Sequence, residues 1–243
     1  MGKYLKKFNT HADYETYIDG QDVLLPNVSY CKDENGMHYN PIETRVIITY
    51  KVTSTSNPTN ICSPNYLSQV SKMWIDDVEQ KNIVASYIFD TTGEHTVKYE
   101  FVDQRYVPAR LFFTMTAIKK VELPNNIIGV GQSAFYYCTN LQTVTFGDSF
   151  ETPSPECFSY CSAITEITLP ETVTAIGYQA FYRCTGITSF TILATTPPEL
   201  SLNNQTFYGT TFPIYVPAES VTAYKTASRW DAWASRIQAI PTT

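Results

Sequence analysis

A pattern of 23 residues is written three times without a gap between residues 118 and 186. Hydrophobic side chains recur at the same place in every copy. Their columns are Ile118/Leu141/Ile164, Val121/Val144/Ile167, Leu123/Phe146/Leu169, Ile127/Phe150/Val173, Ala134/Cys157/Ala180, Phe135/Phe158/Phe181 and Cys138/Cys161/Cys184. One unit of this length cannot bury its apolar side alone, whereas stacked units share a continuous core. The repeat therefore predicts a solenoid, an architecture that usually serves binding.

Each copy contains one short stretch with the two-residue alternation of a β-strand. The stretches are Val121-Glu122-Leu123, Val144-Thr145-Phe146 and Ile167-Thr168-Leu169. Further along, the inward positions lie three or four residues apart, a spacing that fits one helical turn. We therefore expect each coil to consist of a strand, a turn, a helical turn and a return. The strands of successive coils should pair in parallel.

The stretch from Ile164 to Cys184 follows the pattern I-x-x-I-x-L-P-x-x-V-x-x-I-G-x-x-A-F-x-x-C. This pattern closely resembles the BspA-like leucine-rich repeats of bacterial surface proteins. Copy two departs from it, since Gly147 replaces the proline and Cys157 the alanine. The resemblance implies a right-handed solenoid and, for the family as a whole, adhesion or host–microbe contact. It implies no catalytic residues.

The rest of the chain divides into further parts. Residues 1–41 form a polar leader, either an attachment segment or an arm that completes the next domain. Residues 42–101 contain short alternating strands separated by turn residues, which predicts a small immunoglobulin-like β-sandwich. Residues 102–243 form the solenoid, with a degenerate leading coil that begins within the last strand of the sandwich. The whole chain is therefore expected to be mainly β.

The end of the solenoid should be closed by a cap that begins near residue 214. Residues 218–227 have helical spacing, and Trp230 and Trp233 follow them. The tryptophans could form a carbohydrate platform. We prefer an apolar lid, because a terminal repeat leaves about one coil of core to be covered.

Composition excludes some classes of partner. The net charge is −6 and the pI is near 5.1, whereas nucleic acid rewards clustered Lys and Arg. No apolar run is long enough to span a membrane, so membrane insertion is not expected. The N-terminal sequence lacks the apolar core of a secretory signal. Only 16% of the residues are charged and 18 are tyrosine, which is typical of extracellular β proteins.

Sites for chemistry are not apparent. Cys138, Cys161 and Cys184 lie one coil apart and are expected to be buried thiols. The three histidines are scattered, and we interpret Asp76-Asp77 as a solvated turn in preference to a cation site. The sequence contains no nucleophile elbow, phosphate-binding loop or dinucleotide fingerprint. We therefore predict no enzyme activity, catalytic residue, metal or cofactor.

Positions beside the buried phenylalanines carry the candidate site. We call Tyr136/Ser159/Tyr182 the first surface column and Tyr137/Tyr160/Arg183 the second, and Gln132/Pro155/Tyr178 lies nearby. Tyrosine is common at recognition surfaces because it offers area and a hydroxyl at little entropic cost. The predicted partner-binding residues are Tyr136, Tyr137, Tyr160, Tyr178, Tyr182 and Arg183.

The leading hypothesis is a non-enzymatic recognition or adhesion module of a bacterial cell-surface or extracellular protein. It would bind a protein or glycan through the solenoid surface. The alternative is a structural or receptor-binding component of a phage virion or another assembly, with the leader as its attachment point. An intracellular scaffold is a third possibility.

Overall fold

The computed structural model describes residues 28–33, 36–41, 43–201 and 205–242. Contacts divide the chain into two compact units, residues 1–44 and 45–243. In the first unit, strands β1 (Val28–Asp33) and β2 (Gly36–Pro41) pair antiparallel, with Asp33 opposite Gly36. Most of the leader predicted for residues 1–41 lies outside the described residues, and its attachment role stays a prediction.

The second unit begins with strands that were assigned to a separate domain by the sequence. They are β3 (Val46–Val52), β4 (Thr59–Asn60), β5 (Val70–Ile75), β6 (Val78–Glu79), β7 (Ser86–Tyr87) and β8 (Gly93–Phe101), together with the 3₁₀-helix η1 (Pro64–Gln69). Four of them join two solenoid strands in one six-stranded sheet, in the order β12-β10-β3-β8-β5-β6. Val46, Ile48, Tyr50 and Val52 alternate inward along β3 because successive side chains of a strand point to opposite faces.

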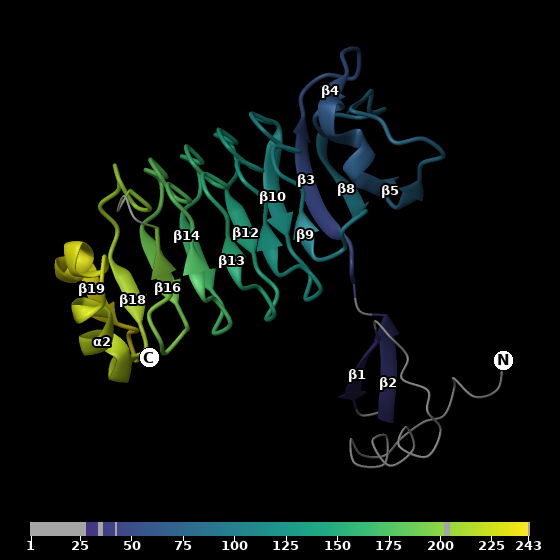
Figure 1. The fold of residues 1–243 in the computed structure, drawn as a ribbon. Helices are drawn as coiled ribbons and strands as arrows, with labels where there is room; N and C mark the ends of the chain where they lie inside the picture. The colour runs from purple at the N-terminus through teal and green to yellow at the C-terminus, as the bar shows by residue number, and fades with distance from the viewer. Residues whose placement is uncertain (1–27, 34–35, 42, 202–204, 243) are drawn as a thin grey trace. The chain divides into compact units, whose positions relative to one another are not determined.

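Strand β3 lies between β8 and the first full coil, and it is antiparallel to both (Figure 1). In the predicted order, β8 would lead straight into the solenoid as part of its leading coil. The pairing of β3 with β10 extends the solenoid's sheet into the N-terminal region. The predicted immunoglobulin-like sandwich is not confirmed, because β3, β8, β5 and β6 share one sheet and only the short β4–β7 pair lies apart.

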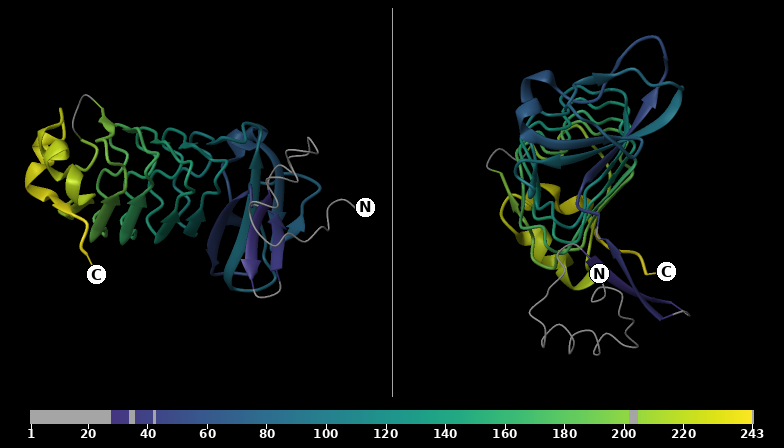
Figure 2. Two further views of the ribbon diagram at one scale, coloured as in Figure 1. Left: turned by 90° about the horizontal axis from the view of Figure 1, so that it is seen from below. Right: turned by 90° about the vertical axis from the view of Figure 1, so that its right-hand side faces the viewer.

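Each coil of the solenoid contributes two strands. The first set is β10 (Ile118–Glu122), β12 (Thr143–Thr145), β14 (Glu166–Leu169), β16 (Ser189–Ile192) and β18 (Ile214–Val216). The second set is β9 (Tyr106–Val107), β11 (Gly129–Val130), β13 (Thr152–Pro153), β15 (Ala175–Ile176) and β17 (Glu199–Leu200). The parallel pairing expected between coils occurs for β10–β12, β14–β16 and β16–β18. Seen from its N-terminal end, the stack of coils follows one outline (Figure 2, right).

The segment before each cysteine is not the helical turn that the spacing predicted. It is a run of tight turns with two left-handed residues in each of the first four coils and one described in the last. One set has φ between 54° and 59° and comprises Arg110, Ser133, Glu156 and Gln179. The other has φ between 53° and 77° and comprises Thr114, Tyr137, Tyr160, Arg183 and Gly209. The three- to four-residue spacing fits both structures, so the sequence alone could not separate them.

Alternate N–H groups of this segment donate hydrogen bonds to the next coil. In coil one the donors are Ser133, Phe135 and Tyr137, at 3.0, 2.8 and 2.8 Å from the carbonyl oxygens of Pro155, Cys157 and Ser159. The same arrangement recurs from coil two to coil three. A Cβ added to Gly177 would lie 2.5 Å from the nitrogen of Pro155, so this close stacking requires glycine there.

The core runs without a break from β3 to the cap. Its centre is a column of stacked rings, the phenylalanine column, made of Phe112, Phe135, Phe158, Phe181 and Phe207. The cysteines beside it are buried as expected. Cys138, Cys161 and Cys184 donate from Sγ to carbonyl oxygens of the preceding coil at 3.2, 3.1 and 3.0 Å.

The C-terminal cap consists of η2 (Ala218–Ser220), α2 (Val221–Thr226), η3 (Asp231–Arg236) and β19 (Ile237–Ala239). Trp230 is buried, and its indole N–H donates to the carbonyl of Pro198 at 2.8 Å. This contact supports the lid interpretation of that residue. Strand β19 adds a parallel partner to β18, with Ile214 opposite Ile237.

Candidate recognition surface

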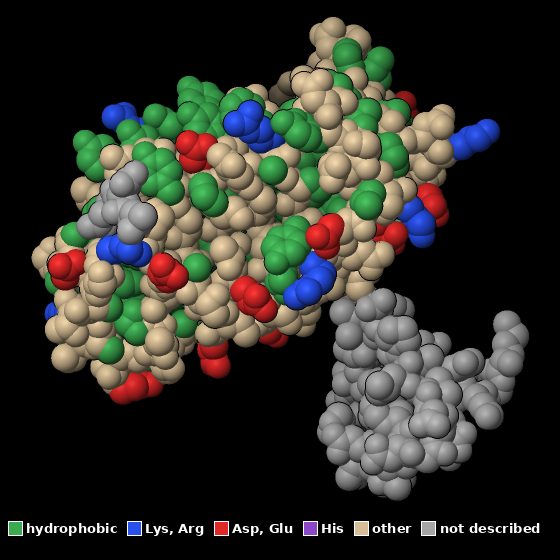
Figure 3. Space-filling view, in the orientation of Figure 1, with side chains coloured by type: hydrophobic (Ala, Val, Ile, Leu, Met, Phe, Trp, Pro, Cys, Tyr) green, Lys and Arg blue, Asp and Glu red, His purple; other side chains and the backbone are tan. Residues whose placement is uncertain are grey.

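Five of the six predicted site residues lie together on the turn edge of the solenoid. Tyr136, Tyr160 and Tyr182 are half-buried, whereas Tyr137 and Arg183 are exposed. All five belong to the run of tight turns whose amides bind the next coil. In Figure 3 hydrophobic side chains, a class that includes tyrosine, gather along the edge where the strands begin. The sixth residue, Tyr178, lies at the start of the same run of turns in coil three, beside the left-handed Gln179.

The rings on this edge form a continuous row, which we call the tyrosine ladder. Neighbouring ring centroids lie 5.0 to 5.5 Å apart, and the members are Phe113, Tyr136, Tyr160, Tyr182 and Tyr208. Tyr137 lies beside the ladder, 5.7 Å from Tyr160. These distances are those of packed aromatic pairs. The ladder therefore offers a pre-arranged aromatic surface that crosses five coils.

The ladder changes column at coil two. Ser159, in the first surface column, is buried and its hydroxyl donates to the carbonyl of Gln179 at 2.5 Å. Tyr160, in the second column, takes the ring position between Tyr136 and Tyr182. In the sequence the first surface column is interrupted at Ser159, but in the structure the row of rings is continuous.

The sequence prediction omitted both end members of the ladder. Phe113 is 38% exposed and stacks on Tyr136, and Tyr208 is 53% exposed and stacks on Tyr182. Both lie in coils that depart from the 23-residue pattern. Their signal was an aromatic residue directly after the buried Phe112 and Phe207.

The second surface column holds two tyrosines in a left-handed backbone conformation. Tyr137 and Tyr160 have φ of 60° and 61°, a conformation that costs a non-glycine residue about 1 kcal/mol. Gly209 occupies the equivalent place in the last coil and has no such penalty. Ser133 and Glu156 share this conformation in the same turns, so the turn itself imposes it on the two tyrosines.

The remaining predicted residues have local partners. Arg183 lies over the ring of Tyr182 at 5.6 Å, and its Nε donates to the Tyr182 hydroxyl at 3.3 Å. Tyr178 is not part of the ladder, and its hydroxyl donates to Oε1 of Gln205 at 3.0 Å. Burial, followed by the proximity of Tyr160, raises the pKa of Tyr136, so this hydroxyl stays neutral and can donate.

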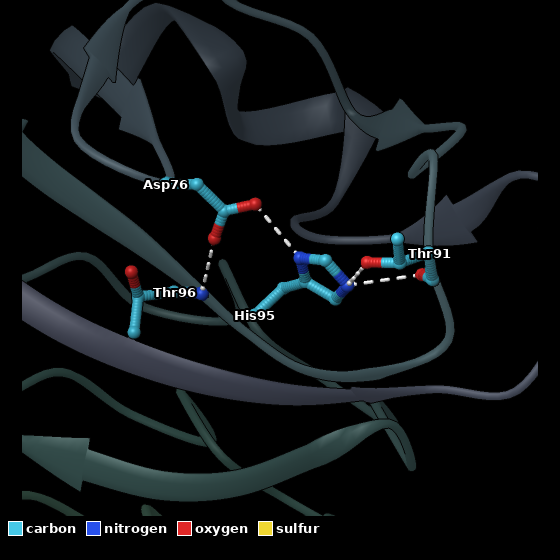
Figure 4. Close-up of polar contacts among 4 residues, drawn as sticks. All are labelled: Asp76, Thr91, His95 and Thr96. Atoms are coloured by element: carbon cyan, nitrogen blue, oxygen red, sulfur yellow. Dashed lines mark hydrogen bonds and ion pairs between the residues drawn. The ribbon is translucent and has the colours of Figure 1, made fainter.

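A second polar cluster joins the turn after β5 to the start of β8 (Figure 4). Nδ1 of His95 lies 2.7 Å from Oδ2 of Asp76, and Nε2 lies 2.9 Å from the carbonyl oxygen of Thr91. The Thr91 hydroxyl is 3.2 Å from Nε2, which gives the outline of a hydroxyl–histidine–carboxylate triad. Asp76 also accepts a hydrogen bond from the Thr96 amide at 3.0 Å.

This cluster is not arranged for catalysis. Nε2 of His95 faces the Thr91 carbonyl oxygen, which only accepts hydrogen bonds, more closely than it faces the Thr91 hydroxyl. A general base would need a lone pair at that nitrogen. His95 also packs against the ring of Phe89, with the centroids 4.4 Å apart. The cluster therefore fixes the residues before β8 to the β5–β6 turn.

The two turn aspartates are occupied by protein groups. Asp77 lies 2.7 Å from Nζ of Lys98, and this hydrogen bond lowers the pKa of the Asp77 carboxyl. In the described part of the chain, no group of three or more His, Cys, Asp or Glu residues could hold a metal ion. Within the same residues, no helix is long and apolar enough to cross a membrane.

Comparison with known proteins identifies the repeat. The model of the BspA type leucine-rich repeat region matches residues 82–212 in six copies, more than half of the chain. The chain belongs to the BspA-type leucine-rich repeat family. Membership confirms the resemblance inferred from Ile164–Cys184 and indicates a binding or adhesion role.

Two proteins of known structure are similar to this chain. One is the pneumococcal vaccine antigen PcpA, with 19% identity over 56% of this chain and 37% of that chain and a TM-score of 0.40. Another is a leucine-rich repeat protein from Bacteroides ovatus, with 15% identity over 82% and 60% of the two chains and a TM-score of 0.30. The chain spans less than two thirds of either protein. No curated protein matches it.

Proposed function

We propose that this BspA-type repeat protein is a non-enzymatic recognition or adhesion module of a bacterial cell-surface protein. Its binding site is the turn edge of the solenoid, and its partner is a protein or a glycan. The observation that carries this proposal is the tyrosine ladder, a partly exposed row of rings across five coils, four of which carry a hydroxyl.

Preorganisation favours binding at this edge. The amides of Tyr137 and Tyr160 donate to Ser159 and Tyr182 at 2.8 Å, so the backbone beneath the rings is fixed before a partner arrives. This edge therefore loses little conformational entropy when a partner binds. Tyr137 keeps a large side chain where glycine or asparagine would have relieved the backbone strain.

Charge along the ladder from coil one to coil three is low and mixed. Arg183 is the cation of the second surface column, and Glu156 accepts a hydrogen bond from the Ser133 hydroxyl at 2.8 Å. Such a surface suits partners recognised by stacking and hydroxyl hydrogen bonds, with charge as a minor contribution. The predicted set Tyr136, Tyr137, Tyr160, Tyr182 and Arg183 is extended by Phe113 and Tyr208, while Tyr178 is at most peripheral.

The test compares the wild-type chain with the double variant Tyr137→Asn/Tyr160→Asn. Asparagine tolerates the left-handed conformation, so the backbone keeps its turns while the rings are lost. Binding to host matrix proteins, intact bacterial cells and a glycan array is measured by fluorescence and biolayer interferometry. We expect saturable binding by the wild type and at least tenfold weaker binding by the variant.

The matched control is Tyr106→Asn. Tyr106 is 42% exposed, close to the 46% of Tyr137, but it lies on β9 away from the ladder. Its loss should leave binding unchanged. If the double variant still binds as the wild type does, the binding site is not on the turn edge. Binding to none of the probes would favour the alternative of a structural component of a phage particle or another assembly, attached through residues 1–41.

A further inference from the structure

A hollow of about 330 Å³ opens at the N-terminal end of the tyrosine ladder. It lies between η1 and the turns of the leading coil, and the ladder's first ring, Phe113, forms part of its wall. The amide of Ser63 donates to the carbonyl of Leu111 at 2.7 Å and holds the two segments together. The volume is at the lower end of the range for small-molecule sites.

An exposed cation lines the hollow. Arg110 lines it from a left-handed backbone position with φ of 58°. Among the described residues, its guanidinium has no hydrogen-bond or ion-pair partner. By contrast, the guanidinium of Arg236 donates to Phe212 and Thr210, and that of Arg229 lies 3.6 Å from Glu199. A guanidinium fork matches a carboxylate through two parallel hydrogen bonds.

The rest of the wall combines the apolar side chain of Met115 with side-chain hydroxyl and amide groups. Ser63, Asn65, Tyr66 and Thr114 contribute them. The backbone amides of Arg110, Phe112 and Thr114 are already bound to carbonyls of coil one at 3.1, 3.0 and 2.7 Å. An extended peptide that adds as a strand needs unpaired backbone amides, and these three amides are already paired. A sugar is recognised instead through its hydroxyls and the apolar face of its ring.

We propose that the hollow binds the acidic sugar of a glycan, a sialic or uronic acid, with its carboxylate on Arg110 and its ring against Phe113. The neighbouring sugars of the glycan follow the tyrosine ladder from Tyr136 onward. This inference rests on the proposed function for the ladder, and it adds the chemical class of the ligand and the residue that selects it.

The experiment uses the full chain and two matched ligand pairs in calorimetry. One pair is sialyllactose and lactose, and the other is a glucuronate-terminated tetrasaccharide and its carboxyl-reduced form. At least one acidic member should bind the wild type about tenfold or more tightly than its neutral partner. Arg110→Gln should abolish that difference, because the substitution removes the charge and keeps a polar side chain.

Arg105→Gln is the control for net charge, since Arg105 is also exposed and does not line the hollow. It should keep the preference for the acidic ligand. Equal binding of acidic and neutral ligands, or an unchanged preference in Arg110→Gln, would overturn the inference and leave the ladder proposal standing. No binding of any of the four ligands would also overturn it. The ladder itself is tested separately with the double variant Tyr137→Asn/Tyr160→Asn, which should lose binding to all ligands if the ladder is the binding surface.

Discussion

Two rows of aromatic rings run side by side through the same turns. The phenylalanine column is fully buried, with neighbouring centroids 5.1 to 6.4 Å apart and rings within 19° of parallel. The tyrosine ladder has a similar spacing, but its members are partly exposed, and Tyr160 meets both neighbours edge-on at 66° and 65°. Adjacent residues of one turn thus do different work. The inner row stabilises the stack, and the outer row is available to a partner.

The largest effect should come from breaking the inner row. Phe158→Ala removes a ring that stacks between Phe135 and Phe181. The neighbouring coils cannot close the space without breaking the backbone hydrogen bonds that join them. We expect a loss of about 3 to 5 kcal/mol in the free energy of unfolding, measured by urea titration. A loss below about 1 kcal/mol would mean that the column is not a shared core.

Alkaline pH should weaken the same buried column at the cysteines beside it. Burial raises the pKa of Cys138 and Cys184 from 9.0 to about 12, so the folded state holds protons that the unfolded state releases. The contribution of these thiols to the free energy of unfolding is fully present below pH 9 and is lost as the pH rises toward 12. We expect about 1 kcal/mol lost per buried thiol at pH 10.

Cys184→Ala tests that origin, because it removes one titrating group and should lessen the alkaline loss. The same burial should protect the native thiols from alkylation at pH 8, which mass spectrometry of the labelled peptides would measure. Rapid labelling of Cys138 or Cys184 in the folded protein would contradict the burial.

The outer row should contribute much less to stability. Tyr160→Ala removes a half-buried ring that fills no core space, and we expect a loss of about 1 kcal/mol or less in the urea titration used for Phe158→Ala. Binding should fall with it. A loss as large as that of the inner variant would make the ladder a structural element and would remove the main support for a recognition role.

The smallest effect concerns backbone strain. Tyr137→Asn should change the melting temperature by no more than a few degrees, because relief of the left-handed tyrosine offsets the lost ring contacts. Gly209 shows that this position accepts a residue without a side chain. A large drop in melting temperature would show that Tyr137 is held by packing, and its strain would then say nothing about function.

The sequence was a good guide wherever a contact repeats with the coil. The inward columns, the short strands and the buried cysteines could be found because each follows from its place in the 23-residue unit. The tryptophan lid could be found because an open stack needs a cover. The ladder could be found only in part, since Phe113 and Tyr208 lie in irregular coils and the exchange of Ser159 for Tyr160 depends on which side chain turns inward.

The sequence by itself determined that the chain stacks coils of one length and which side of each coil is buried, because the period and the apolar columns leave no other way to hide those side chains. Only the tertiary structure decided that β3 inserts between β8 and β10, and that rings from two columns align in one ladder. Hydrogen bonds and ring contacts between segments distant in the sequence set both features, and no local pattern encodes such pairings. The hollow beside Arg110 exists for the same reason, since η1 and the leading coil meet only in the folded chain.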